Sequence, residues 1–495
     1  MRVHAKGVRK RGPEVGLSFS ETSSTGGSPM KYNTEMINQM AQQMAEMFKI
    51  AVIAQQASEG SAPTIAQIEA DMREALRQVG NQALGLFLSS MQMTPEKEML
   101  CSCGGTLHYQ RMREAMVISV FGRTLYVRAY YAGCQCKQGK APLDEQFGLE
   151  AGAVTAGLAT LLALAGIEFS YAKSPQWLQA YLLFDISENT VRSETERMGA
   201  LQEKREEEMI QQSQDEGYLQ ERQRNPGRII SRLYGSIDAA KVRIEPRPRK
   251  GEDKKAHEDW RDMKLLCWFE TETVPPSQRS KRQQKKAIRE QVALRARNMQ
   301  YFCNITKAEE FGKLLWATGC TVNADLCQDL VFLGDGAVWI WNLVTQYYPH
   351  AKQIVDWYHA EEHLELVAAA AFSDLSQRAI WLEETTQALW EGLVEDVIAA
   401  CESLAQTCPL ASQAVTYFTN NAERMRYARF RAAGYMIGSG TIESGCKQIV
   451  SQRLKLPGAQ WIVSGAVRTA KARAAWLSEQ WHILCAQRSA LPLAA

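Results

Sequence analysis

LVFLGDGAVWIW, residues 330–341, indicates the fold more clearly than any other segment of the sequence. An apolar run typical of a buried strand ends in a Gly-Asp-Gly turn at Asp335, and an apolar helical segment follows. Two more acids lie at comparable places, Asp238 in LYGSIDAAKVRI (233–244) and Glu443 in MIGSGTIESGCKQI (436–449). Asp238 follows another strand-like run, and Glu443 opens an expected helix after a Gly-Ser-Gly turn. We expect the three carboxylates to meet at one sheet edge and hold divalent metal ions, although most acids at such places only cap or flank an element.

The surrounding elements predict an α/β domain, a mixed sheet flanked by helices. Strands are expected around Asp238, at 263–270 and at 299–305, followed by a helix at 308–318. The strand before Asp335, a helix at 337–347 and a strand at 351–357 complete the set. This β-β-β-α-β-α-β order is that of a ribonuclease-H-like fold. The stretch 358–431 reads as almost wholly helical, which predicts an all-helical insertion before the helix of Glu443.

Length and composition predict a multidomain α/β protein. A chain of 495 residues exceeds what one core usually supports, and its net charge of +2 gives no global reason for a polyanionic partner. No apolar leader follows the N-terminus, and the uncharged run 151–167 is shorter than the roughly 20 residues of a membrane span. We therefore expect a cytoplasmic, nucleoid-associated protein without a membrane partner.

Twelve cysteines without an export signal indicate a reducing compartment, where spacing points to metal binding or core packing. Cys101-Ser-Cys103 and Cys134-Gln-Cys136 bracket an expected hairpin, VISVFGRTLYVRAYY (117–131). Four thiolates brought together by a hairpin satisfy tetrahedral Zn²⁺, and the segment resembles a zinc ribbon. The pairs are C-x-C rather than the commoner C-x-x-C, and the alternative is reduced cysteines without metal.

Residues 174–199 have the outline of a helix-turn-helix, with a turn at Ser187 and a second helix exposing Asn189 and Arg192. Ordinary helical hairpins share this outline. The following stretch, rich in Glu, Gln and Arg, ends at an Asn-Pro-Gly turn and predicts a solvated helical linker before a new domain near residue 228.

The second half of the chain resembles a known family. Residues from about 228 to 475 are similar to the catalytic domain of DDE-type insertion-sequence transposases, most closely the ISKra group. Asp356-Trp-Tyr-His359 matches the D-x-x-H motif of the related Mutator-like transposases. The resemblance makes Asp238, Asp335 and Glu443 the three catalytic acids, in that order.

What the resemblance implies is two-metal phosphoryl transfer. The three acids would hold two Mg²⁺ (or Mn²⁺) ions roughly 4 Å apart. Asp356 and His359, at the end of a neighbouring strand, would orient a phosphate, protonate a leaving group or simply bond to each other. Residues 359–363 also satisfy H-x-x-E-H, the pattern of a zinc peptidase, but no third protein ligand is identifiable.

Two basic segments are candidate DNA contacts. Residues 279–297 carry eight lysines and arginines, suited to neutralising phosphates unless the segment is only a solvated loop. Lysines and arginines at helical spacing after Glu443 form the second basic segment. The expected contacts are Arg279, Lys281, Arg282, Lys285, Lys286, Lys447, Arg453 and Lys455, together with Asn189 and Arg192.

These features predict eight segments. They are a basic lead (1–32), a helical region (33–95), a zinc-ribbon-like hairpin (96–145), a helix-turn-helix-like domain (146–200), a linker (201–227), a ribonuclease-H-like catalytic domain (228–357 and 432–475), its helical insertion (358–431) and a tail (476–495).

The expected function is a transposase that acts on double-stranded DNA as a homodimer or higher homo-oligomer. It would bind the terminal inverted repeats of its element, cleave at the ends and join the 3′ ends to target DNA. The rivals are a domesticated, non-catalytic DNA-binding protein and, remotely, a zinc peptidase.

Overall fold

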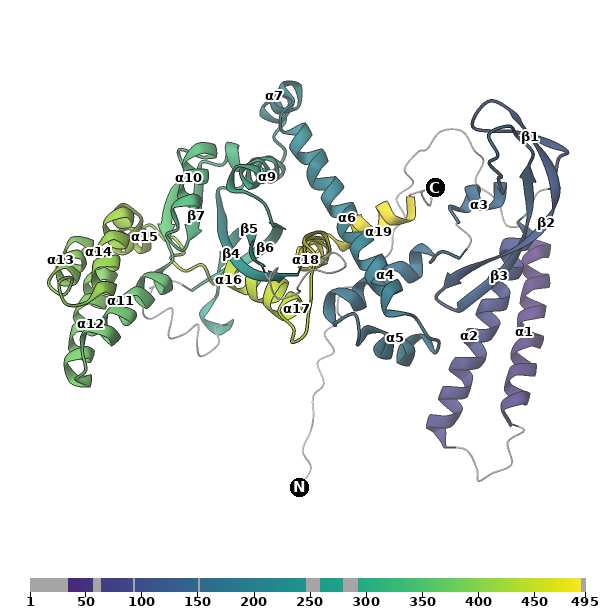
Figure 1. Cartoon of the computed structure of the whole chain (residues 1–495), viewed down its shortest axis with the longest axis horizontal. Coiled ribbons are helices and arrows are strands. Elements are labelled where there is room, and N and C mark those ends of the chain that lie inside the picture. Colours follow the sequence, from purple (N-terminus) through teal and green to yellow (C-terminus); the bar gives the residue numbers. More distant parts are fainter. Residues whose placement is uncertain are drawn as a thin grey trace, which may run out of the picture. The chain divides into compact units, whose positions relative to one another are not determined.

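The computed structural model describes residues 34–56, 64–91, 94–149, 152–245, 259–278 and 293–490 (Figure 1). The chain divides into two compact units, Met1–Ala75 and Leu76–Ala495. The first holds helix α1 (Thr34–Gln56) and the start of α2 (Ile65–Ser90), as the predicted helical region requires. The second unit contains both β-sheets, so the protein is a mixed α/β chain as expected.

The first sheet has three antiparallel strands in the order β1-β2-β3. They are β1 (Glu98–Leu100), β2 (Thr106–Ser119) and β3 (Gly122–Ala132). A tight turn joins β2 to β3, with Ser119 paired to Gly122, which confirms the hairpin predicted over 117–131. Gly122 has a φ of 113°, a conformation that glycine adopts without steric cost.

The sheet is followed by the helices α3 (Pro142–Phe147), α4 (Ala156–Glu168), α5 (Ser174–Leu182) and α6 (Glu188–Gln212). The Ser187 hydroxyl accepts the backbone N–H of Thr190 at 3.1 Å, so it caps α6 where the sequence predicts the turn. The α5–turn–α6 outline is therefore present. However, α6 continues to Gln212, which is 13 residues beyond the end of the predicted helix-turn-helix segment at residue 199.

The expected linker 201–227 is not fully solvated. Gln202 and Glu206 on α6 are buried. The Glu206 carboxylate forms an ion pair with the ammonium group of Lys471, a buried residue of α18 (Val463–Leu477). A short helix, α7 (Glu216–Arg224), completes the segment, and its Arg222 pairs with Asp325 at 2.7 Å. Two charges of this segment, Glu206 and Arg222, are therefore buried and paired with opposite charges elsewhere in the fold, whereas many of its other charged residues are exposed.

The second sheet has five strands in the order β6-β5-β4-β7-β8. They are β4 (Arg232–Ile244), β5 (Asp259–Thr273), β6 (Leu294–Asn304), β7 (Asp329–Gly334) and β8 (Lys352–Val355). The first three form an antiparallel meander, whereas β4, β7 and β8 run parallel. Helices α9 (Ala308–Thr321) and α10 (Val338–Tyr347) precede β7 and β8 respectively. All the predicted strands and both helices are confirmed.

Helices occupy the stretch for which an insertion is predicted (Figure 1). They are α11 (Trp357–Ala371), α12 (Leu375–Trp390), α13 (Val394–Glu402), α14 (Pro409–Asn421) and α15 (Tyr427–Ala432). Their apolar faces share one continuous core with the five-stranded sheet. The insertion is thus packed into the domain that it interrupts.

The chain then forms α16 (Gly440–Gly445), a π-helical turn (Cys446–Ser451), α17 (Gln452–Leu454) and α18. The last helix, α19 (Trp481–Ala490), lies in the stretch predicted as a tail. Its Trp481 and Leu484 are buried in a cluster with Ala163 and Met198, so this segment belongs to the folded unit.

Candidate active site

Three aspartates lie where the parallel strands β4, β7 and β8 reach the same edge. Ser236 pairs with Leu333, and Asp238 and Asp335 each lie two residues further along, which brings them to the same level. Gly334 pairs with Val355, and Asp335 and Asp356 are the next residues. Because parallel strands present their carboxyl ends at one edge, this register gathers acids that are far apart in sequence.

Asp238 lies within β4 rather than after it, which differs from the sequence expectation. It pairs with Leu265, and the pairing of β4 with β5 continues to Ile244. The pairing of β4 with β7 ends at Ser236, so Asp238 lies where β4 is still paired with β5 but no longer with β7. The carboxylate therefore sits on rigid strand backbone, which fixes its position better than a loop would.

Glu443 approaches from α16. The loop before this helix is fastened to α11 through Asp356, whose side chain is fully buried. One carboxylate oxygen of Asp356 accepts the backbone N–H groups of Tyr358 and His359 at 2.5 and 3.0 Å. The other oxygen accepts the N–H of Ser439, whose hydroxyl bonds Glu443 at 3.2 Å. Asp356 thus positions the helix of Glu443, and its oxygens are already occupied by backbone donors.

The acids influence one another electrostatically. The pKa of Asp238 is raised above its ordinary value, first by burial and further by the charge of Asp335. Glu443 is exposed as a whole residue, yet partial burial of its carboxyl group raises its pKa, and the charges of Asp356 and Asp238 add to this. Neighbouring carboxylates thus add to the raised pKa of Asp238 and of Glu443, and a cation would relieve such gathered negative charge.

The turn after β7 holds Asp335. One of its carboxylate oxygens accepts the N–H of Ala337 at 2.9 Å, and Gly336 adopts a φ of 97°. Two residues of α14 bind the backbone of this turn. The Tyr417 hydroxyl donates to the carbonyl of Asp335 at 2.9 Å, and the Asn421 amide donates to that of Gly336 at 3.4 Å. No sequence pattern indicates these two contacts, because the partners are more than 80 residues apart.

Cys446 is a second residue that the sequence analysis misses. Its buried thiol donates to the Asp238 carboxylate at 3.2 Å, and its own pKa is raised by burial and by that acid. It follows Glu443 by three residues and so shares its helix face, which is the one signal that would have identified it. Cys446 also begins the π-helical turn, a distortion that is frequent at functional sites.

His359 lies in the first turn of α11. Its charge lowers the pKa of both Asp238 and Glu443, against the burial that raises these pKa values. Its ring nitrogen is 3.5 Å from the Glu362 carboxylate. His363, one turn later, stacks on Tyr417 with 3.9 Å between ring centres, and burial lowers its pKa. The H-x-x-E-H residues therefore share one helix, but among the described residues no third ligand joins the two histidines in a compact group.

The donor set fits Mg²⁺ in kind, because hard carboxylate oxygens are the ligands that this ion prefers. Among the described residues, no group containing the three acids has its ligand atoms all within 4.8 Å of one another. A single ion would need such a compact set. Two ions roughly 4 Å apart spread their ligands further and retain water, so the wider spacing is compatible with a pair.

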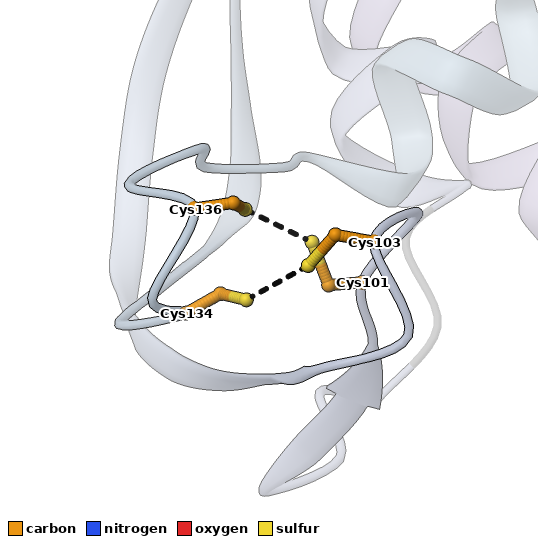
Figure 2. A group of neighbouring side chains, drawn as sticks. All are labelled: Cys101, Cys103, Cys134 and Cys136. Carbon is orange, nitrogen blue, oxygen red and sulfur yellow. Dashed lines mark hydrogen bonds between the residues drawn. The ribbon is translucent and has the colours of Figure 1, made fainter.

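The four cysteines of the first sheet do form a compact group (Figure 2). Their sulfur atoms all lie within 4.8 Å of one another, with 3.4 Å between Cys101 and Cys136 and 3.2 Å between Cys103 and Cys134. A side chain at Gly105 would place its Cβ 2.7 Å from the Cys134 sulfur, so the close approach of the two loops requires glycine. The thiols are free, and the group is a possible metal site.

Thiols of this cluster differ in pKa. Backbone hydrogen bonds lower the pKa of Cys103 and Cys136, but neighbouring thiols raise it further, so both pKa values lie above the ordinary one. A hydrogen bond from the backbone of Cys103 is the main reason that the pKa of Cys101 falls to about 6. A low pKa favours the thiolate, which is the form that binds zinc. Four sulfurs at these spacings fit the tetrahedral coordination of a structural zinc site.

The expected DNA contacts have different environments. Lys447, Lys455 and Asn189 are exposed, and Arg192 is half-buried and bonds Asn189. Arg453 is only 2% exposed, since its guanidinium donates to the Gly166 carbonyl at 2.7 Å and lies over the rings of Tyr171 and Trp461. The other predicted contacts, Arg279, Lys281, Arg282, Lys285 and Lys286, lie outside the described residues.

Comparison with known proteins gives no independent identification: no protein-family model matches the chain, and no curated protein matches it. In the described part of the chain, no helix has both the length and the apolar character needed to cross a membrane.

Proposed function

We propose that this protein is a metal-dependent DNA transposase of the DDE type, as its resemblance to ISKra-group insertion-sequence transposases implies. The observation that carries the proposal is the common level of Asp238 and Asp335 on neighbouring parallel strands, with Glu443 on a helix whose preceding loop is bonded to Asp356 at the same sheet edge. The sheet order β6-β5-β4-β7-β8, a meander followed by two parallel strands, supports a ribonuclease-H-like fold for the catalytic domain.

In this proposal Asp238, Asp335 and Glu443 hold two Mg²⁺ ions. When bound, the ions would activate water or a 3′-hydroxyl and stabilise the departing oxygen. The chain's own residues supply the geometry. β4 fixes Asp238, the turn after β7 fixes Asp335, and Asp356 fastens the loop that leads to Glu443. His359, in the first turn of the helix that Asp356 caps, would meet a phosphate oxygen beside the acids.

The remaining parts would bind DNA. We propose that the four-cysteine cluster holds a structural zinc ion, which would close the two loops beside the first sheet. The exposed Asn189 and Lys455, with the half-buried Arg192, would contact double-stranded DNA, and the protein would act as a homo-oligomer on the two element ends. Phosphate contacts of this kind position a protein on DNA, whereas base contacts would read the inverted repeats.

A plasmid mobility assay tests the proposal. The gene's flanking inverted repeats would bracket a marker, and excision and integration would be scored for wild type and Asp335→Asn. We expect mobility with wild type only, together with unchanged binding of the repeats by the variant. Wild-type mobility in Asp335→Asn would reject the assignment of the acids. Repeat binding by a wild type that neither moves the marker nor nicks DNA with Mg²⁺ or Mn²⁺ would favour a non-catalytic DNA-binding protein.

A further inference from the structure

Tyr417 of α14 contacts the turn that carries Asp335 in two ways. Its hydroxyl donates to the Asp335 carbonyl at 2.9 Å. Its ring lies against Gly336, where an added Cβ would come within 2.6 Å of a ring carbon. Glycine is therefore required at 336 twice, for its φ of 97° and for the close approach of the tyrosine ring.

The same ring connects the turn to α11. It stacks on His363, with 3.9 Å between ring centres and 24° between the planes. Asn421, one helical turn after Tyr417, donates to the Gly336 carbonyl at 3.4 Å. The turn is thus held by β7 on one side and by two side chains of the helical insertion on the other.

We propose that Tyr417 is a positioning residue for the reaction, so that the insertion forms part of the active-site scaffold. Its hydroxyl fixes the peptide between Asp335 and Gly336, and this keeps the Asp335 carboxylate level with that of Asp238. The inference rests on the proposed function, because it assigns Asp335 as a metal ligand.

The glycine at position 336 is the reason that the turn needs the hydrogen bond from Tyr417. A turn through Gly336 has more accessible backbone conformations than a turn through another residue, and the described hydrogen bond of the Asp335 carboxylate is a local one, from the N–H of Ala337. Removing the tyrosine hydroxyl would leave the carboxylate less well defined. Partners that orient metal ligands typically contribute about 10- to 100-fold to metal affinity or activity.

The experiment compares Mn²⁺ binding, measured by the electron paramagnetic resonance signal of free Mn²⁺, in the full-length protein without DNA. Tyr417→Phe keeps the ring and its stacking but loses the hydroxyl. Tyr348→Phe is the matched control, since that buried hydroxyl donates to the Leu315 carbonyl at 3.4 Å within the same domain. The background is a triple variant, Asp238→Asn with Asp335→Asn and Glu443→Gln. Asn421→Ser provides a second test of the turn if Tyr417→Phe folds poorly.

We expect Tyr417→Phe to weaken Mn²⁺ binding by about tenfold or more, with Tyr348→Phe equal to wild type. Asn421→Ser should weaken binding in the same direction. Equal Mn²⁺ affinity in wild type, Tyr417→Phe and Asn421→Ser would overturn the inference and leave the metal site of the acids intact. Wild-type binding no stronger than that of the triple variant would overturn the proposed metal site, and the role of Tyr417 with it.

Discussion

The buried carboxylate of Asp356 accepts the backbone N–H of Ser439, which joins the start of the helical insertion to the loop before Glu443. The same carboxylate caps α11 through Tyr358 and His359. One side chain therefore sets the relation between two elements that contribute to the site. Asp356 thus joins two elements through its carboxylate, whereas the Asp335 carboxylate accepts the N–H of Ala337 within its own turn.

Asp356→Ala should lower the free energy of unfolding by about 3 kcal/mol, because three backbone N–H groups lose a charged acceptor. Asp374 offers a matched control. Its side chain caps α12 by accepting the N–H groups of Ser376 and Gln377 at 2.8 and 2.9 Å. Asp374 is exposed, and these described side-chain bonds stay within α12. Asp374→Ala should cost about 1 kcal/mol. Urea unfolding measures both, and equal losses would contradict the fastening role of Asp356.

The stability of the metal-free protein should depend on pH through Asp238. Burial and the charge of Asp335 raise the pKa of Asp238 in the folded state, so the folded state holds a proton more tightly than the unfolded state does. The resulting stability is present below the ordinary pKa of an aspartate, about 4, and is lost as the pH rises through the raised value.

Asp238→Asn removes this ionisation. We expect the variant to gain stability relative to the wild type as the pH rises from about 4, and the gain to level off above the raised pKa. The measurement is urea unfolding in chelator over a pH series. Saturating Mg²⁺ should reduce or reverse the gain, since it stabilises only the wild-type acids. A gain that does not change with pH would contradict the raised pKa.

The fold was more predictable than the site. The hairpin over 117–131 and the strands of the second sheet could be predicted because they depend on local patterns: alternating polar and apolar residues in the hairpin, and short apolar runs in the strands. The contacts of Tyr417 and Cys446 join residues 82 and 208 positions from their partners, and no local pattern encodes them. Arg453 and Lys471 look like surface cations in sequence, yet each is 2% exposed, because each contacts a distant element: Arg453 the Gly166 carbonyl and Lys471 the Glu206 carboxylate.

Zinc content should follow the four-cysteine cluster. Purified wild type should hold about one zinc ion per chain, and Cys101→Ser should lose it and loosen the first sheet. Cys327→Ser is the control, because that half-buried thiol donates to the Ile230 carbonyl at 3.2 Å, away from the cluster. Metal analysis and proteolysis measure the two effects. Equal zinc content in wild type and Cys101→Ser would count against a zinc ion at this cluster.

Lys455 and Arg453 should respond differently to loss of charge. Exposed Lys455 is a candidate phosphate contact, so Lys455→Gln should reduce the salt dependence of DNA binding by about one unit of slope without changing stability. Arg453→Gln should instead lower the free energy of unfolding by about 2 kcal/mol, because its guanidinium packs between two rings. Salt titrations of binding and urea unfolding separate the two roles. A pure binding defect in Arg453→Gln would contradict its burial.

The most direct test of the central claim is cleavage of a labelled DNA end, an inverted repeat with its flanking sequence, by purified protein. The account predicts strand cleavage at the repeat boundary with Mg²⁺ or Mn²⁺. It predicts no cleavage by Asp238→Asn, Asp335→Asn or Glu443→Gln, while each variant still binds the repeat. Cleavage at the wild-type rate by any of the three, or cleavage by wild type in the presence of chelator, would contradict it.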